Sequence, residues 1–174
     1  MDELSAIAVT FEDIDRYIGR WRHRLVEAAQ YDVPPHITLL YPWVAPPVAE
    51  DSMMRMKAVL ATSEPFDVSF LTLARFGDEV LYLVPEDNGQ LDRLARELAE
   101  AFPETPPYGN TSLEPIPHLT VASGSGLDLD SLQTELESEL KSELPLKYRV
   151  EQVSVLFCST NGYWRTVSLH QLGA

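Results

Sequence analysis

The sequence has little that would tie it to a membrane or to an oxidising compartment. It contains no apolar run near the ~20 residues of a membrane-spanning helix, and Met1-Asp2-Glu3 lacks the basic start of a signal peptide. Its single cysteine, Cys158, cannot form an internal disulfide, and its apolar neighbours favour a core position over a nucleophilic role. We therefore expect a cytoplasmic protein that does not act at a membrane.

Positive charge is also scarce: 13 Lys and Arg residues stand against 27 Asp and Glu, for a net charge of −14. Such a surface repels polyanions and lacks the basic stripe that grips long nucleic acid. A phosphate-bearing partner would therefore be a small molecule or a short RNA end held by a few donors. The alternative is that the acidity only keeps the protein soluble.

The apolar periodicity predicts strands that alternate with helices. The helices are expected to pack outside antiparallel sheets in an α+β fold. A proline-rich connector covers residues 103–117, His23 is expected on a solvated helix face, and His170 is expected at the surface after the last strand. Strands are expected at 5–11, 36–44, 66–75, 79–84, 118–122, 146–157 and 163–169, and helices at 12–29, 50–62, 88–102 and 129–144.

The order of these elements occurs twice, in about residues 5–75 and again in 79–170. Each half runs strand, helix, proline-bounded His-x-Thr strand, helix and strand pair. A duplicated unit of this kind usually associates about a pseudo-two-fold axis, which would set the two equivalent strands across a shared cleft. We expect a monomer with one domain over residues 1–174, whose two interleaved lobes each carry an antiparallel sheet.

Two of the four histidines lie in nearly the same five-residue sequence, "PHITL" at 35–39 and "PHLTV" at 117–121. Alternate side chains of a strand point to the same face, so His36 projects with Thr38 and His118 with Thr120. One His-x-Thr pair is most simply structural. Its repetition after proline, at matching places in two similar halves, predicts a functional site.

Two facing imidazoles can open a phosphodiester without a metal, because one can be neutral while the other is charged. With a cyclic nucleotide phosphate, one would take a proton from the attacking water and the other would protonate the departing ribose oxygen. The threonine hydroxyls would hydrogen-bond the non-bridging phosphate oxygens. No acidic residue or cysteine accompanies either motif, so we expect no metal and no other cofactor.

The two stretches His36-Ile37-Thr38-Leu39 and His118-Leu119-Thr120-Val121 resemble the paired His-apolar-Thr/Ser-apolar signature of the 2H phosphoesterase superfamily. Within it, "VPPHITLLYPW" resembles the bacterial 2′-5′ RNA ligase family and the RNA 2′,3′-cyclic phosphodiesterases. The resemblance implies a bilobal α+β fold with a metal-independent site between the lobes. It implies that His36 and His118 are the acid–base pair and that Thr38 and Thr120 bind phosphate. Which histidine is the base depends on the direction of the reaction.

The sequence departs from the RNA-processing branch at one position. That branch commonly carries arginine three residues after the second threonine, where this chain has Ser123. A mononucleotide, dinucleotide or nucleotide-sugar cyclic phosphate is therefore expected in place of long RNA. Tyr41 and Phe11 are candidates to stack on a base, with core packing as the alternative. Arg75 and Arg165 are candidate phosphate partners, with a solvated position as the alternative.

The leading hypothesis is thus a metal-independent cyclic phosphodiesterase with four catalytic residues, His36, Thr38, His118 and Thr120. One alternative is a nucleotide-binding or regulatory module that keeps the cleft without the chemistry. Another is the joining of RNA ends through a 2′-5′ bond, which is the same chemistry run in reverse.

Overall fold

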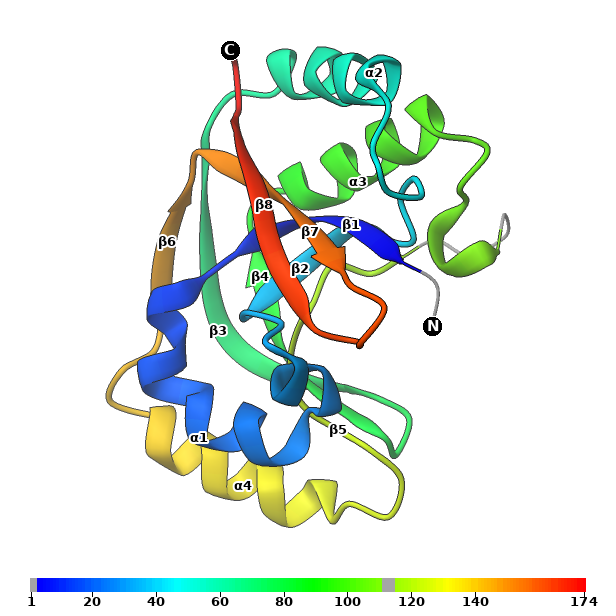
Figure 1. The fold of residues 1–174 in the computed structure, drawn as a ribbon. Coiled ribbons are helices and arrows are strands. Elements are labelled where there is room, and N and C mark those ends of the chain that lie inside the picture. Colours follow the sequence, from blue (N-terminus) through cyan, green and yellow to red (C-terminus); the bar gives the residue numbers. More distant parts are fainter. Residues whose placement is uncertain (1–2, 111–114) are drawn as a thin grey trace.

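A computed structural model describes residues 3–110 and 115–174, so residues 111–114 of the expected connector lie outside the described part (Figure 1). No helix in these two segments has both the length and the apolar character needed to cross a membrane. Three short 3₁₀ helices, η1 (Glu12–Ile14), η2 (Glu27–Tyr31) and η3 (Pro107–Gly109), accompany the main elements. The main elements are β1 (Leu4–Thr10), α1 (Asp15–Leu25), β2 (His36–Leu40), α2 (Glu50–Ala61), β3 (Phe66–Phe76), β4 (Val80–Glu86), α3 (Gln90–Ala101), β5 (Leu119–Ser123), α4 (Leu129–Leu140), β6 (Leu146–Val150), β7 (Gln152–Cys158) and β8 (Trp164–Gln171).

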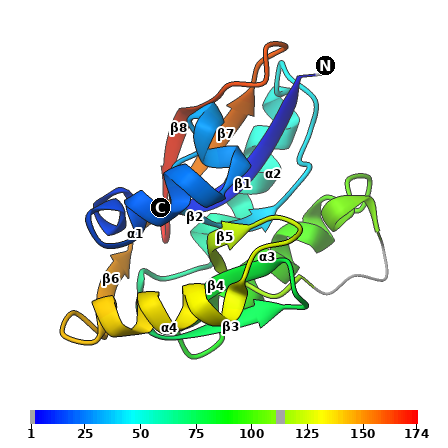
Figure 2. The same ribbon diagram turned by 90° about the horizontal axis from the view of Figure 1, so that it is seen from below.

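The strands form two antiparallel four-stranded sheets with matching topologies, β2-β1-β7-β8 and β5-β4-β3-β6. In each sheet the strand of the His-x-Thr motif is an edge strand. The two edge strands, β2 and β5, contact each other at the centre of the molecule (Figure 2). The expected α+β fold with two antiparallel sheets is therefore confirmed, and its symmetry brings the two motifs together.

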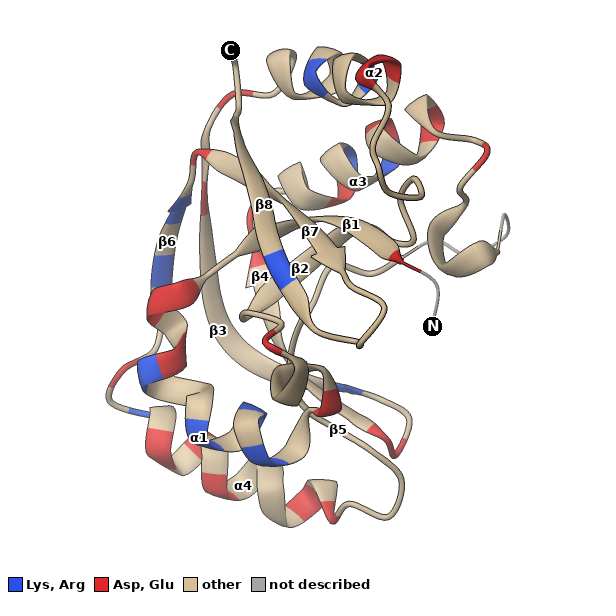
Figure 3. Ribbon diagram, viewed as in Figure 1, with Lys and Arg blue, Asp and Glu red and all other residues tan. Residues whose placement is uncertain are grey.

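Two helices pack against a strand of the half of the chain to which they do not belong. Helix α1 follows β1 but lies against β5, and α3 follows β4 but lies against β2. Helices α2 and α3 pack at one end of the molecule, and α1 runs beside α4 at the other (Figure 1). Basic positions of α1 lie near acidic positions of α4 (Figure 3), where Arg20 pairs with Glu139. Each motif strand is thus backed by a helix from the other half of the chain.

The alternation predicted for the motif strands is present. Ile37, Leu39, Leu119 and Val121 are at most 1% exposed and belong to the main core. The histidines and threonines between them are half-buried on the opposite face. Burial of the apolar residues therefore fixes the direction in which the imidazoles and hydroxyls point.

The expected strand at 146–157 is wrong, because the structure divides it between the two sheets. β6 pairs with β3, whereas β7 pairs with β1 and β8. The break falls at Glu151, which is exposed and whose carbonyl accepts a hydrogen bond from the Leu172 N–H at 2.8 Å. The apolar alternation shifts by one position there, because two polar residues, Glu151 and Gln152, follow Val150 before the pattern resumes at Val153. Apolar residues on both sides of this short interruption favoured a single strand.

The expected helix at 12–29 is interrupted at Val26. This residue is extended (φ −118°, ψ 110°) and 5% exposed, so burying its side chain competes with continuing the helix.

The first motif strand ends at Leu40 and not at Val44, since Pro42 cannot donate a ladder hydrogen bond. His170 lies inside β8, hydrogen-bonded to Ser168 at 2.8 Å, and not beyond the strand. Cys158 is buried, as expected.

Candidate active site

The four motif residues meet in a single pocket of about 240 Å³, called the motif pocket below. β2 supplies His36 and Thr38 from one sheet. In the other sheet, Thr120 lies in β5 and His118 directly precedes that strand. Residues more than eighty positions apart in sequence therefore share one cavity. The full lining is Arg22, Val26, Ala28, His36, Thr38, Val80, Tyr108, His118, Thr120 and Ser123.

The two imidazoles are held by the same local hydrogen bond. Nδ1 of His36 lies 2.8 Å from the carbonyl of Pro34, and Nδ1 of His118 lies 2.7 Å from the carbonyl of Ile116. A carbonyl only accepts, so each Nδ1 carries the proton and each neutral ring keeps its lone pair on Nε2. Neither Nε2 has a hydrogen-bond partner among the described residues. Both rings thus keep one nitrogen available for a ligand.

The protonation of the two histidines is biased toward the neutral form. Burial lowers the pKa of His36 from 6.5 to about 4; its bond to Pro34 opposes the shift, and the nearby charges of Arg22 and His118 add to it. Burial also lowers the pKa of His118, against its bond to Ile116. At physiological pH His36 is therefore in the neutral form, in which Nε2 carries a lone pair.

We expect NMR titration of the His36 ring to give a pKa well below 6.5, near 4. The resonance can be assigned by its loss in His36→Asn. Because the unfolded ring would bind a proton that the folded ring does not, this group leaves stability intact above pH 6.5 and lowers it as the pH falls toward 4. A ring that titrates at or above 6.5 would contradict the buried placement.

Tyr108 closes one side of the motif pocket in a strained conformation. Its φ of 52° is in the left-handed region, which costs a bulky residue about 1–3 kcal/mol. Burial raises the pKa of the Tyr108 hydroxyl, and the nearby Thr38 side chain opposes this shift. The Tyr108 N–H donates to the carbonyl of Tyr41 at 2.6 Å. The connector that precedes the second motif is thereby attached to the strand of the first.

A second, aromatic pocket of about 290 Å³ adjoins the first and shares His36 and Thr38 with it. Tyr41 lies here, as part of an aromatic group in which its ring centroid is 6.0 Å from those of both Tyr108 and Trp164. The lining also includes three small apolar side chains, those of Ala6, Ala28 and Val33. The predicted base-stacking residue Tyr41 is therefore beside the motif residues, and Trp164 accompanies it.

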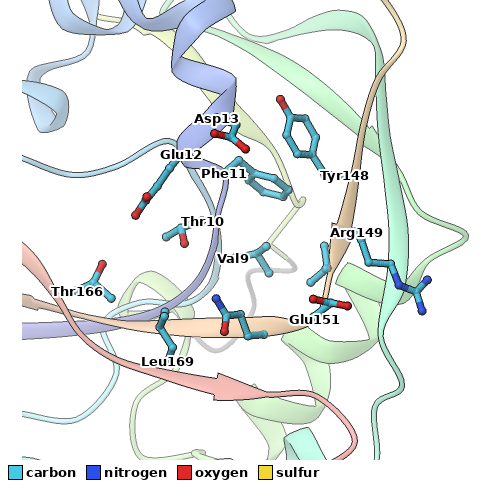
Figure 4. A pocket seen from close by; sticks show the side chains of 12 residues that line it. Val9, Thr10, Phe11, Glu12, Asp13, Tyr148, Arg149, Glu151, Thr166 and Leu169 are labelled. Carbon is cyan, nitrogen blue, oxygen red and sulfur yellow. The ribbon is translucent and has the colours of Figure 1, made fainter.

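The structure does not bring Phe11 or the two candidate arginines to the motif pocket. Phe11 is 4% exposed and packs edge-on against Phe70 and Tyr148, at the wall of a separate hollow of about 420 Å³ (Figure 4). Arg75 binds Gln133 and Asp130 of α4 and the carbonyl of Leu129. Arg165 is exposed on β8.

Arg22 is a pocket residue that the sequence reasoning missed, as are Tyr108 and, in the adjoining pocket, Trp164. Arg22 is 2% exposed, yet it lines the motif pocket from α1. One signal was available: Arg22 lies four residues after the buried Ile18 and so on the same face of the helix. The polar residues His23 and Arg24 follow it directly, and together the three residues were interpreted as a solvated stretch of the helix.

The described residues contain no group of three or more His, Cys, Asp or Glu side chains that could hold a metal ion. The polar groups of the motif pocket are imidazoles, hydroxyls and one guanidinium. These groups can transfer protons and donate hydrogen bonds to an anion.

Comparison with known families agrees with this geometry. The model of the 2′-5′ RNA ligase superfamily matches residues 10–157, which include both motifs. The chain belongs to this superfamily. The predicted resemblance to the 2H phosphoesterases is therefore confirmed.

One curated protein and several solved structures are similar to this chain over most of their length. A protein of Geobacillus kaustophilus (strain HTA426) with the name "Putative phosphoesterase GK0864" is 26% identical over 137 residues, 76% of this chain and 75% of that protein. TT0787 of Thermus thermophilus is 16% identical with a TM-score of 0.63, covering 100% of this chain and 99% of its own. E. coli LigT complexed with 3′-AMP is 14% identical with a TM-score of 0.61, covering 99% of each chain.

Proposed function

We propose that this protein is a metal-independent phosphodiesterase that opens the 2′,3′-cyclic phosphate of a small nucleotide or a short RNA end. One observation carries the proposal: two imidazoles with the same Nδ1 anchor enter one pocket and both keep Nε2 available. A structural histidine pair would not need two matching anchors that leave the same nitrogen free. The reaction needs one proton accepted and one donated at a single phosphorus centre.

The environments of the two rings divide the roles between them. His36, with its pKa of about 4, is neutral and takes the proton of the water that attacks phosphorus. His118, opposite it beside β5, protonates the ribose oxygen as the bond from phosphorus to that oxygen breaks. Anion binding favours the charged form of His118, because an opposite charge nearby raises the pKa of an imidazole. In the reverse direction the two roles exchange.

Phosphate stabilisation comes from hydroxyl groups on both strands. Thr38 and Thr120 donate to the non-bridging oxygens, on which charge must be stabilised in the transition state. Ser123 lines the same pocket three residues after Thr120. Hydroxyls provide donors without a basic surface, in keeping with the net charge of −14.

The size and lining of the two pockets support a nucleotide-sized substrate. With phosphate between the imidazoles, the adjoining pocket would receive the base against Tyr41 and Trp164. Stacking of this kind tolerates different bases, since every base has a π-face. Structures of E. coli LigT, which shares the fold, are complexes with 3′-AMP and with NADP⁺, molecules of this size class.

Purified protein treated with EDTA is expected to hydrolyse adenosine 2′,3′-cyclic phosphate to a monophosphate. Phosphorus NMR would follow the loss of the cyclic signal and identify the isomer formed. The same assay on a longer RNA that ends in a cyclic phosphate tests the size limit.

Hydrolysis that requires added metal would refute the mechanism. Tight nucleotide binding without product, unchanged in a variant that lacks both imidazoles, would instead indicate a binding module.

A further inference from the structure

We infer that Arg22 binds the phosphate of the ligand in the motif pocket and supplies its fixed positive charge. The inference names a specificity residue for the proposed function and rests on it. It concerns a helix residue outside both motifs.

Arg22 lies where it can contact a ligand in the motif pocket. Arg22 is 2% exposed and lines the pocket together with both histidines. It reaches the pocket because α1 lies against β5, on the side of the second motif. None of the described residues that line this pocket is Asp or Glu, although the chain has 27 of them. The pocket is therefore a local exception to the acidic character of the protein.

The N–H groups of the Arg22 guanidinium are only partly hydrogen-bonded within the described residues. Nη1 of Arg22 lies 3.4 Å from Asp15 Oδ1, and Nη2 lies 3.3 Å from the carbonyl of Val33. Both distances exceed the usual range of about 2.7–3.2 Å for N–H···O bonds. A guanidinium has five N–H groups, so three have no partner among the described residues. A buried cation with unused donors matches a phosphate, whose oxygens accept paired N–H groups.

Arg22 also affects the pKa of His36, the proposed base. The charge of Arg22 helps to lower the pKa of His36 and so favours the unprotonated form of that ring. The charged groups that act on His36 are Arg22 on α1 and His118 beside β5. Tyr108 and Tyr41 line pockets together with His36, and Asp15 pairs with Arg22. Among the described residues that line the motif pocket, Arg22 is the one Lys or Arg, so it supplies the permanent positive charge there.

The test uses inorganic phosphate as the probe and the imidazole resonances of His36 and His118 as the readout. We expect Arg22→Met to bind phosphate about 10- to 100-fold more weakly, and Arg22→Lys to lie between it and the wild type. Arg22→Met should also raise the pKa of His36 and move the acid limb of the pH–rate profile upward. Arg24→Met makes the same charge change at an exposed position of α1 and should alter neither.

Methionine is a tolerable replacement, because exchanging a buried ion for an apolar side chain of similar size is often neutral. Should Arg22→Met fail to fold, Arg22→Gln, which keeps a donor for Val33, carries the same expectation. Phosphate affinity within about twofold of wild type in either variant would overturn the inference, as would wild-type imidazoles that do not respond to phosphate. Phosphate binding needs no turnover, so an absence of cyclic phosphodiesterase activity would count against the proposed function alone.

Discussion

His36→Ala and His118→Ala are each expected to lower kcat for a 2′,3′-cyclic nucleotide by about 10²–10⁴-fold. Each variant removes one of the two proton transfers while the pocket and its hydroxyls remain. KM should change much less, because the imidazoles act mainly in the transition state. Steady-state kinetics in EDTA, with circular dichroism to verify folding, would measure the effect.

The pH–rate profile separates the two roles. In the wild type, loss of activity as the pH falls reports protonation of the base, and loss as it rises reports deprotonation of the acid. His36→Ala should remove the acid limb and His118→Ala the alkaline limb.

His170→Gln is the matched control, since this histidine lies in β8 and lines neither pocket. The amide of glutamine can take the place of Nε2 in the bond to Ser168. The double variant should lose little more than either single one, because the two groups act as a unit. Single variants that retain a tenth or more of wild-type kcat would refute the acid–base assignment.

Thr120→Val and Thr38→Val are expected to lower kcat by about 10²–10³-fold each, the loss typical of one donor to a developing oxyanion. Valine has a similar shape and favours strands, so the edge strands should persist. Thr120 gives the cleaner result. Its hydroxyl has no hydrogen-bond partner within the described segments, whereas the side chain of Thr38 also acts on Tyr108, whose pKa it lowers against the larger effect of burial.

Thr72→Val, at an exposed position of β3, makes the same chemical change outside both pockets and should have wild-type kinetics. Thr→Ser substitution at 38 or 120 should restore most of the activity, since it returns the donor. A valine variant with unchanged kcat would show that the hydroxyl does not contact phosphate.

Much of the secondary structure is predictable because local patterns determine it. The hairpin of β3 and β4 and the helix α3 follow from turn residues and from apolar residues at helical spacing. The failures occur where tertiary contacts prevail over local pattern. Val26 leaves the helix to enter the core, and the chain at Glu151 passes from one sheet to the other.

The candidate site divides in the same way. His36, Thr38, His118 and Thr120 were predictable because a strand places alternate residues on one face, and because the motif occurs twice. Tyr41 was placed near them by its position just past the first motif. Phe11 was proposed from its position at the end of the first strand, but its ring is buried in the core against Phe70.

The sequence by itself determined the superfamily, the α+β class and the four motif residues, because these depend on short-range periodicity and on a repeated pattern. Only the tertiary structure decided that Arg22 joins the pocket and that Arg75 does not. Helix α1 packs on a strand of the opposite half, so the burial of Arg22 depends on a contact about a hundred residues away. Arg75 is instead held by α4. Local sequence patterns do not specify which elements pack against one another across the two halves.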